Sequence, residues 1–283
     1  MEDGGFTVVQ HRRNQRGRSA KWGKRPTHAN RFEPTQAPFT QQACRALETK
    51  VQSAKQQLTQ SLFLHELKSH LPNNIHQLAC FGIGNFADVP AATFQVALSF
   101  ILYDHVRQRA PPGQDVDFNS YDPIFSELEK GFLERCHCHV PKSNEEGRRC
   151  APNVTLFFMP HCGRQLYANL LRANWSIENL QRLIIIGNSF EEYCIATHGA
   201  ENGDLISRAA EFVTETSLSG TSPGRFANAF CSIRLHTFDP SHLSRAPDPF
   251  WRLDPESPIS ASGELLSQTD IILASESKEM YPE

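Results

Sequence analysis

Four small clusters of glycine and polar residues are the part of this sequence that could do chemistry. Each follows a short apolar run, and together they comprise Gly82, Gly84 and Asn85; Asp122; His161 and Cys162; and Asn188 and Ser189. Glycine lets the backbone approach a ligand closely, and the polar groups supply directed hydrogen bonds. These residue types predict a ligand-binding site, with His161 as the candidate catalytic residue if the protein is an enzyme.

The glycine cluster satisfies the relaxed dinucleotide-binding pattern G-x-G-x-x-A through Gly82, Gly84 and Ala87. A glycine turn that leads into a helix suits an anion, because unpaired N–H groups point at the ligand. The helix is expected to begin near Asp88, later than the pattern requires, so an ordinary tight turn stays open. Asp122 lies 38 residues beyond Gly84, whereas the ribose-binding acid lies about 20 residues on, so a capping role for Asp122 also stays open.

His161 and Cys162 could form a thiolate and its base, the pair used in covalent catalysis. Residues adjacent in sequence seldom present their side chains to each other in that geometry, and the usual partners are distant. We therefore expect His161 to contact a ligand rather than to activate Cys162, and its titration near neutrality would serve that role.

The tetrapeptide Cys136-His137-Cys138-His139 has the composition of a metal site. On a strand its two cysteines face one way and its two histidines the other, so the four side chains cannot converge on one ion. No second C-x-x-C or H-x-x-x-H pair accompanies it, and we expect no metal site.

Alternating strands and helices must position these clusters. The strands are expected at residues 78–81, 116–121, 153–159, 183–186 and 229–238. A long helix follows the first of them, with Asp88 as its N-cap and Pro90 in its first turn. The alternation predicts an α/β fold, a single Rossmann-like domain with a doubly wound, mostly parallel sheet. Ligands bind outside the carboxyl ends of such strands, so the four clusters are expected on one rim.

Composition divides the chain into four parts. We expect a disordered basic arm at 1–38, an amphipathic helix packing on the core at 39–74, the Rossmann-like domain at 75–240 and a disordered acidic tail at 241–283. The arm carries eight Lys or Arg and no acid between His11 and Arg31. This segment could direct nuclear localisation or contact nucleic acid, and a solubilising tail is the alternative.

The net charge of −3 predicts no general attraction to nucleic acid or membranes, so nucleic-acid contact is expected only through the arm. The sequence has no run of 18 apolar residues and no secretory signal at Met1. We expect a cytoplasmic protein that also enters the nucleus, does not bind membranes and keeps its eight cysteines reduced.

Several motifs across roughly residues 76–240 carry a family resemblance. They are Gly82-Ile83-Gly84-Asn85-Phe86; Tyr121-Asp122-Pro123 with Glu127; Leu156-Phe157-Phe158-Met159-Pro160-His161-Cys162-Gly163; Leu166-Tyr167 with Asn169-Leu170; Gly187-Asn188-Ser189-Phe190 with Tyr193; and Ala229-Phe230 with His236 and Phe238. On these residues the chain resembles the "sensitivity to red light reduced" (SRR-like) family. Relatives usually carry Asn-Asp after Ala-Phe, whereas Cys231 and Ser232 stand here.

The resemblance implies a regulatory protein, because relatives are linked to circadian clock output and light signalling, and in animals to haem biosynthesis and clock-gene expression. It implies no established catalytic activity. Its partner would be an unidentified protein or a small metabolite. The alternative is an orphan, methyltransferase-like transferase that uses a nucleotide-like cofactor. The sequence has no Cys-Pro pair and no C-x-x-C-H site, so we do not expect a haem site.

Overall fold

The computed structural model describes residues 40–196, 204–218 and 226–253. The expected basic arm at 1–38 lies outside the described residues, as does most of the expected acidic tail. Among the described helices, none is long and apolar enough to cross a membrane.

Six strands form one mixed sheet that is parallel in all but one strand. They are β1 (Gln77–Phe81), β2 (Asp117–Tyr121), β3 (Thr155–Met159), β4 (Leu183–Asn188), β5 (Val213–Ser217) and β6 (Ile233–Phe238). Their order across the sheet is β2-β1-β3-β4-β6-β5, and β6 runs antiparallel to both of its neighbours. The α/β fold with a mostly parallel, doubly wound sheet is therefore confirmed.

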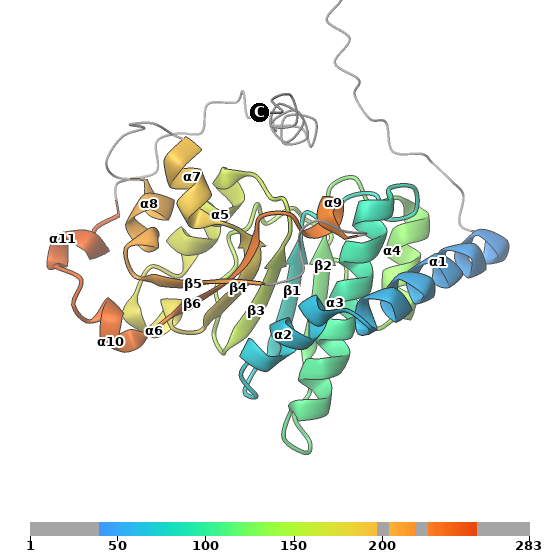
Figure 1. Cartoon of the computed structure of the whole chain (residues 1–283), viewed down its shortest axis with the longest axis horizontal. Helices are drawn as coiled ribbons and strands as arrows, with labels where there is room; N and C mark the ends of the chain where they lie inside the picture. The colour runs from blue at the N-terminus through green and yellow to red at the C-terminus, as the bar shows by residue number, and fades with distance from the viewer. Residues whose placement is uncertain (1–39, 197–203, 219–225, 254–283) are drawn as a thin grey trace, which may run out of the picture. The chain divides into compact units, whose positions relative to one another are not determined.

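Helices cover both faces of the sheet and give three layers (Figure 1). One face is covered by α1 (Gln41–Thr59), α2 (Leu62–His70), α3 (Pro90–Arg109), α4 (Glu127–Arg135) and α9 (Ala227–Phe230). The other is covered by α5 (Arg164–Ala173), α6 (Ile177–Leu180), α7 (Phe190–Ala196), α8 (Leu205–Ala210), α10 (Pro240–Leu243) and α11 (Asp248–Trp251).

Successive residues of the central strands enter opposite layers of this core. In β3, Leu156 and Phe158 pack on the α1–α4 side, whereas Phe157 and Met159 pack against α5 and its neighbours. This alternation follows from the pleat of a strand, and burial on both faces explains why the strand reads as continuously apolar.

The segment expected to form one amphipathic helix forms two. Thr40 caps α1 as expected, with its Oγ1 accepting from the N–H of Ala43 at 3.1 Å. The helix then stops at Thr59, and Ser61 caps a new helix by accepting from the N–H of Leu64. A serine that can cap a helix competes with continuation of the preceding one. The apolar stripe continues across this break, which is why periodicity alone did not reveal it.

The expected N-cap of α3 is wrong by one residue. Val89 occupies the N-cap position and makes no side-chain cap bond, while Pro90 lies in the first turn as expected. Asp88 is instead held by Asn85, whose Oδ1 accepts from the Asp88 N–H at 3.1 Å. The side chain of Asn85 therefore makes a hydrogen bond within the glycine turn, just before α3 begins.

The last predicted strand is shorter than expected at its start. Residues 227–230 form α9, and only residues 233–238 form β6. Two short helices, α10 and α11, follow beyond residue 240, where the tail was expected to begin. Phe250 in α11 is buried against Trp175, whose indole Nε1 donates to the Phe250 carbonyl at 2.9 Å. Folded structure therefore continues at least to α11.

Candidate functional site

The eight residues singled out in the sequence lie at the carboxyl ends of four adjacent strands, which we call the carboxyl edge. The strand order β2-β1-β3-β4 arranges them side by side in the order Asp122; Gly82, Gly84 and Asn85; His161 and Cys162; and Asn188 and Ser189. The parallel topology causes this convergence, because parallel strands all end on the same side of the sheet.

The glycine turn is held by carboxylates of the chain itself. Gly82 and Gly84 adopt left-handed conformations, with φ of 69° and 78°, which glycine reaches without a Cβ clash. The N–H of Gly84 donates to Oδ2 of Asp122 at 2.8 Å, and the N–H of Ile124 donates to Oδ1 at 3.0 Å. Asp122 therefore locks the turn after β1 to the turn after β2. Burial raises the pKa of Asp122 and outweighs the effect of these hydrogen bonds.

A second carboxylate, Glu129, was missed by sequence reasoning. Its side chain is fully buried, and Oε1 accepts from the N–H of Ala87 at 2.9 Å. Oε2 accepts from the N–H and the hydroxyl of Ser126, both at 2.8 Å, to complete a capping box at the start of α4. The pattern Ser-x-x-Glu could have revealed it. By contrast, Glu127, the acidic residue of the family motif, is exposed and forms an ion pair with Lys130.

Cys162 packs directly against the glycine turn. A Cβ placed on Gly82 would lie 2.5 Å from its Sγ, so the approach requires glycine. The thiol donates to the Phe81 carbonyl at 3.3 Å. Burial raises the pKa of Cys162 well above its usual range, and the negative charge of Asp122 adds to this effect. Cys162 is therefore a protonated thiol rather than a nucleophilic thiolate.

His161 adopts a backbone conformation that is uncommon outside glycine, with φ of 53°. Its N–H donates to Oδ1 of Asn188 at 2.9 Å, and its ring Nε2 lies 3.1 Å from the carbonyl oxygen of Ala229. That contact requires the hydrogen to be on Nε2. Burial lowers the pKa of His161, although the bond to Ala229 opposes this. The neutral ring keeps Nδ1 as a hydrogen-bond acceptor. Gln95 of α3 donates to the same carbonyl at 3.0 Å, which fixes α9 beside the edge.

Asn188 joins the ends of β3 and β4. Its Nδ2 donates to the Tyr193 hydroxyl at 2.8 Å and to the Cys162 carbonyl at 3.3 Å, and Tyr193 donates to that carbonyl at 2.6 Å. Its main-chain N–H donates to the hydroxyl of Tyr167, a buried side chain of α5 that also donates to the Met159 carbonyl and so links the ends of the two strands. This network orders the turns that carry His161 and Ser189.

The turn after β4 is bonded to a third carboxylate, Glu215 of β5, which accepts a hydrogen bond from the side chain of Ser189. Oε2 of Glu215 accepts from the N–H of Phe190 at 3.0 Å and lies 3.4 Å from Nε2 of His236. Nδ1 of His236 lies 3.1 Å from the Ile185 carbonyl, so Nδ1 carries a hydrogen. Burial alone would raise the pKa of Glu215, but hydrogen bonds from His236, Ser189 and Phe190 lower it to about 2. Glu215 could not be found from the sequence pattern, because strand β5 was not predicted.

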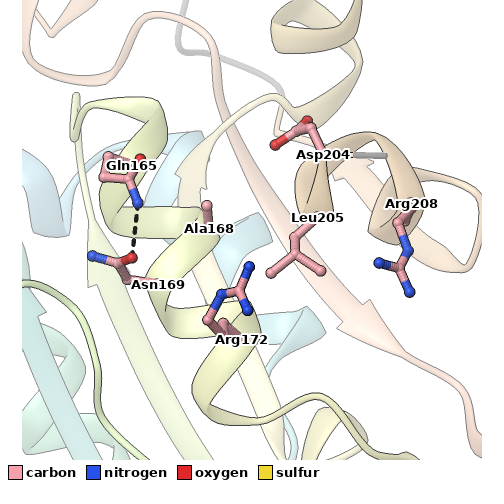
Figure 2. Close-up of a pocket in the computed structure, with 7 residues that line it drawn as sticks. All are labelled: Gln165, Ala168, Asn169, Arg172, Asp204, Leu205 and Arg208. Atoms are coloured by element: carbon pink, nitrogen blue, oxygen red, sulfur yellow. Dashed lines mark hydrogen bonds between the residues drawn. The ribbon is translucent and has the colours of Figure 1, made fainter. Parts of the chain in front are cut away.

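Two cavities lie away from the residues of the sequence-predicted site. Figure 2 shows the first, a space of about 210 Å³ between α5 and α8. Asp204 at the edge of this cavity forms an ion pair with Arg164. Arg208 stacks on Trp175 and donates to the Phe250 carbonyl. Both charged side chains therefore already have partners within the fold. The second, about 440 Å³, lies between α1 and α3 and reaches the end of the glycine turn at Ala87.

The geometry defines a class of protein: a three-layer α/β domain whose sheet presents a glycine turn and an ordered polar network at its carboxyl edge. The chain matches the model of the SRR1 domain over residues 47–237. It therefore belongs to the SRR1 domain family. The matched region begins within α1 and ends within β6, so it includes the helices α1 and α2 as well as the sheet.

Three curated relatives support this assignment. The chain is 35% identical over 144 residues to the Arabidopsis thaliana protein named SENSITIVITY TO RED LIGHT REDUCED 1, a match that covers 46% of this chain and 50% of that protein. It is 34% identical over 186 residues to an SRR1-like protein of Mus musculus, covering 59% of this chain and 73% of the relative. An SRR1-like protein of Drosophila melanogaster is 28% identical over 201 residues, covering 71% and 68%.

Proposed function

We propose that this chain is a regulatory protein of the SRR1 family that binds a partner or a small ligand at the carboxyl edge. The observation that carries the proposal is the Asn188 network, which bonds the turns after β3 and β4 to each other and holds the partly buried His161 at the edge. Such a prearranged set of polar groups lowers the entropic cost of binding.

Recognition by hydrogen bonding fits the edge better than covalent catalysis does. The thiol of Cys162 is buried with a raised pKa, and burial raises the pKa of Tyr193 to about 12 despite its bond to Asn188. Neither group is an activated nucleophile near neutral pH. His161 is then a ligand contact, through its Nδ1 acceptor, and not the base of a catalytic dyad.

The biological role that we propose follows the family. The Arabidopsis relative is named for reduced sensitivity to red light, and the resemblance implies roles in circadian clock-gene expression and in regulation of haem biosynthesis. These roles would place the chain in the cytoplasm and the nucleus, with the basic segment His11–Arg31 available for nuclear import or nucleic-acid contact.

A methyl-transferring enzyme is the second candidate, and the topology of the sheet favours it. The sheet is parallel except for the reversed strand β6 between β4 and β5, and open α/β sheets of this kind bind nucleotide-like cofactors at the carboxyl ends of their strands. Asp122 at the end of β2 stands where dinucleotide folds bind a ribose hydroxyl. This support is an analogy between folds, and function resides in sites rather than in folds.

Gly163 offers a clean test of the proposal. It is exposed next to Cys162, and a Cβ placed on it would meet no atom within 4 Å. Gly163→Trp should cover the edge without disturbing the fold, and Gly163→Ala is its matched control. In cells that lack the endogenous protein, we expect the Ala variant to restore the rhythm of a clock-gene reporter and the Trp variant, at equal abundance, to fail. Equal rescue by both variants would refute a functional role for the edge.

A further inference from the structure

We infer that the cavity between α5 and α8 binds a free α-amino acid, with the carboxylate of the ligand on Arg208 and its ammonium group on Asp204. The inference goes beyond the proposed function, because the cavity lies away from the predicted residues of the carboxyl edge and does not require that edge to bind anything. It rests on the cavity and on two opposite charges that α8 holds apart.

The cavity has the size and the lining of a site for a small metabolite. Its volume is about 210 Å³, below the roughly 300 to 1,000 Å³ of pockets for drug-sized ligands. Its walls are formed by Gln165, Ala168, Asn169 and Arg172 on the α5 side and by Asp204, Leu205 and Arg208 on the α8 side (Figure 2). The four α5 residues have the spacing of one helix face. This largely polar face is turned toward α8, where packed helices ordinarily bury apolar side chains.

Asp204 presents one carboxylate oxygen that is not used by the fold. The hydrogen bonds that hold it all go to Oδ2, from Arg164 and from the N–H and hydroxyl of Ser207 at 3.1 and 3.0 Å. Among the described residues, none donates to Oδ1. Gln165 on the α5 wall is similar, because its Nε2 donates to Asn169 at 2.8 Å and its Oε1 accepts from no described residue. These two oxygens can accept hydrogen bonds from an ammonium group.

Arg208 presents the opposite charge. Its Nη2 donates to the carbonyl of Phe250 and, at 2.9 Å, to the carbonyl of Arg252, and its guanidinium lies 5.0 Å from the ring centre of Trp175. These partners fix the group in place but are neutral, so they do not compensate its charge. Within the part of the chain that the structure describes, Nη1 donates to no acceptor, so it can bind a carboxylate through a charge-assisted hydrogen bond.

The two charges face a ligand whose own charges are adjacent. Asp204 and Arg208 are four residues apart, a spacing that brings Cβ atoms within about 5 to 6 Å on a helix and lets opposite charges pair. These two described residues do not pair with each other, and Figure 2 shows their charged groups apart. An α-amino acid carries both complementary groups on one carbon, so it satisfies Asp204 and Arg208 together. The apolar side chains of Ala168 and Leu205 in the walls suit a small apolar side chain such as that of valine.

L-Valine and two analogues that each lack one charge test the inference on the wild-type full chain. In 3-methylbutanoate the ammonium group is missing, and in 2-methylpropylamine the carboxylate is missing, while both keep the branched side chain. Binding would be measured by saturation-transfer NMR and calorimetry. We expect L-valine to bind and each analogue to bind at least about tenfold more weakly, because each leaves one charged group of the cavity without its partner. No binding of L-valine, or equally tight binding of either analogue, would overturn the inference.

Two variants locate the binding site. Ala168→Phe fills the cavity and should abolish binding of L-valine. Asp204→Asn keeps a residue that caps α8 well but removes the charge, and should weaken binding at least about tenfold. Asp239→Asn is the matched control, because Asp239 caps α10 in the same way and does not line the cavity; it should bind L-valine like the wild type.

Melting temperatures would establish that each variant is folded. Unchanged binding of L-valine by folded Ala168→Phe would place the ligand elsewhere and contradict the inference. If neither cavity variant folds, the comparison of L-valine with its analogues on the wild type still decides the question. The cellular rescue by the Gly163 variants decides the proposed function separately.

Discussion

Replacing Glu215 by Gln tests whether the partly buried charge beside α7 stabilises the carboxyl edge. Gln keeps a carbonyl oxygen that can accept from the N–H of Phe190, and it has nearly the same volume as Glu. It removes the negative charge that lies 3.4 Å from Nε2 of His236 and 3.8 Å from Nε of Arg234. The variant therefore isolates the charge from the hydrogen bonds at the start of the helix.

The expected loss follows from the pKa of Glu215, which falls from 4.5 to about 2 on folding. At about 1.4 kcal/mol per pKa unit, the charge contributes at most about 3.4 kcal/mol. The Glu215 side chain is 17% exposed, and solvent screening reduces the value, so we expect a loss of about 2 kcal/mol in the free energy of unfolding near neutral pH. Because the folded pKa is lowered, the contribution is complete above about pH 4.5 and is lost as the pH falls toward about 2.

Urea unfolding of the full chain, followed by circular dichroism, would measure this loss at several pH values. The gap between wild type and Glu215→Gln should be about 2 kcal/mol at neutral pH and should shrink below about pH 4.5. Glu191→Gln removes an exposed carboxylate at the same helix end and should change stability by no more than about 0.5 kcal/mol. Equal stability of the Glu215 variant and the wild type at neutral pH would refute the reasoning, as would a gap that stays constant on acidification.

Three further predictions concern the same edge. Gly82→Ala should destabilise the fold by about 2 to 3 kcal/mol, because φ at this position is positive and the added Cβ would clash with Cys162. The control Gly163→Ala should change the stability by no more than about 0.5 kcal/mol. Comparable melting temperatures of the two variants would contradict the prediction. Tyr167→Phe should lower the free energy of unfolding, measured in urea, by about 1 to 3 kcal/mol, because the Met159 carbonyl of β3 and the Asn188 N–H of β4 lose their buried hydrogen-bond partner. A change below about 0.5 kcal/mol would show that water replaces the hydroxyl. In the native protein iodoacetamide should alkylate the exposed Cys150 much faster than the buried Cys162, as read by peptide mass spectrometry, and equal rates would disprove the burial of that thiol.

The central strands could be predicted from the sequence because each is buried on both faces. Residues 155–159 and 183–186 read as continuous apolar runs, and strand β1 is flanked by glycine. Strand β5 could not be found in this way, because Val213–Ser217 is a polar sequence at the outer edge of the sheet. With β5 missing, the reversal of β6 was also hidden.

The positions of the candidate residues followed from topology, but their partners did not. Parallel strands bring Gly84 and Asp122 to one edge, yet the bond between them joins residues 38 apart in the sequence. The bond from Ala87 to Glu129 spans 42 residues, and that from Phe190 to Glu215 spans 25. Periodicity reports which face a residue occupies and not which distant group it bonds. The glycine pattern therefore suggested an anion site, whereas the chain's own carboxylates hold those N–H groups.

Native mass spectrometry of gently purified protein tests most directly the central claim that the carboxyl edge is a binding site. The wild type and Gly163→Ala should retain the mass of a small molecule or of a partner, and Gly163→Trp should lose it while keeping the same melting temperature. Loss of the retained mass in the Trp variant alone would support the edge as the site of recognition. An identical retained mass in all three proteins, or none in any of them, would contradict that claim.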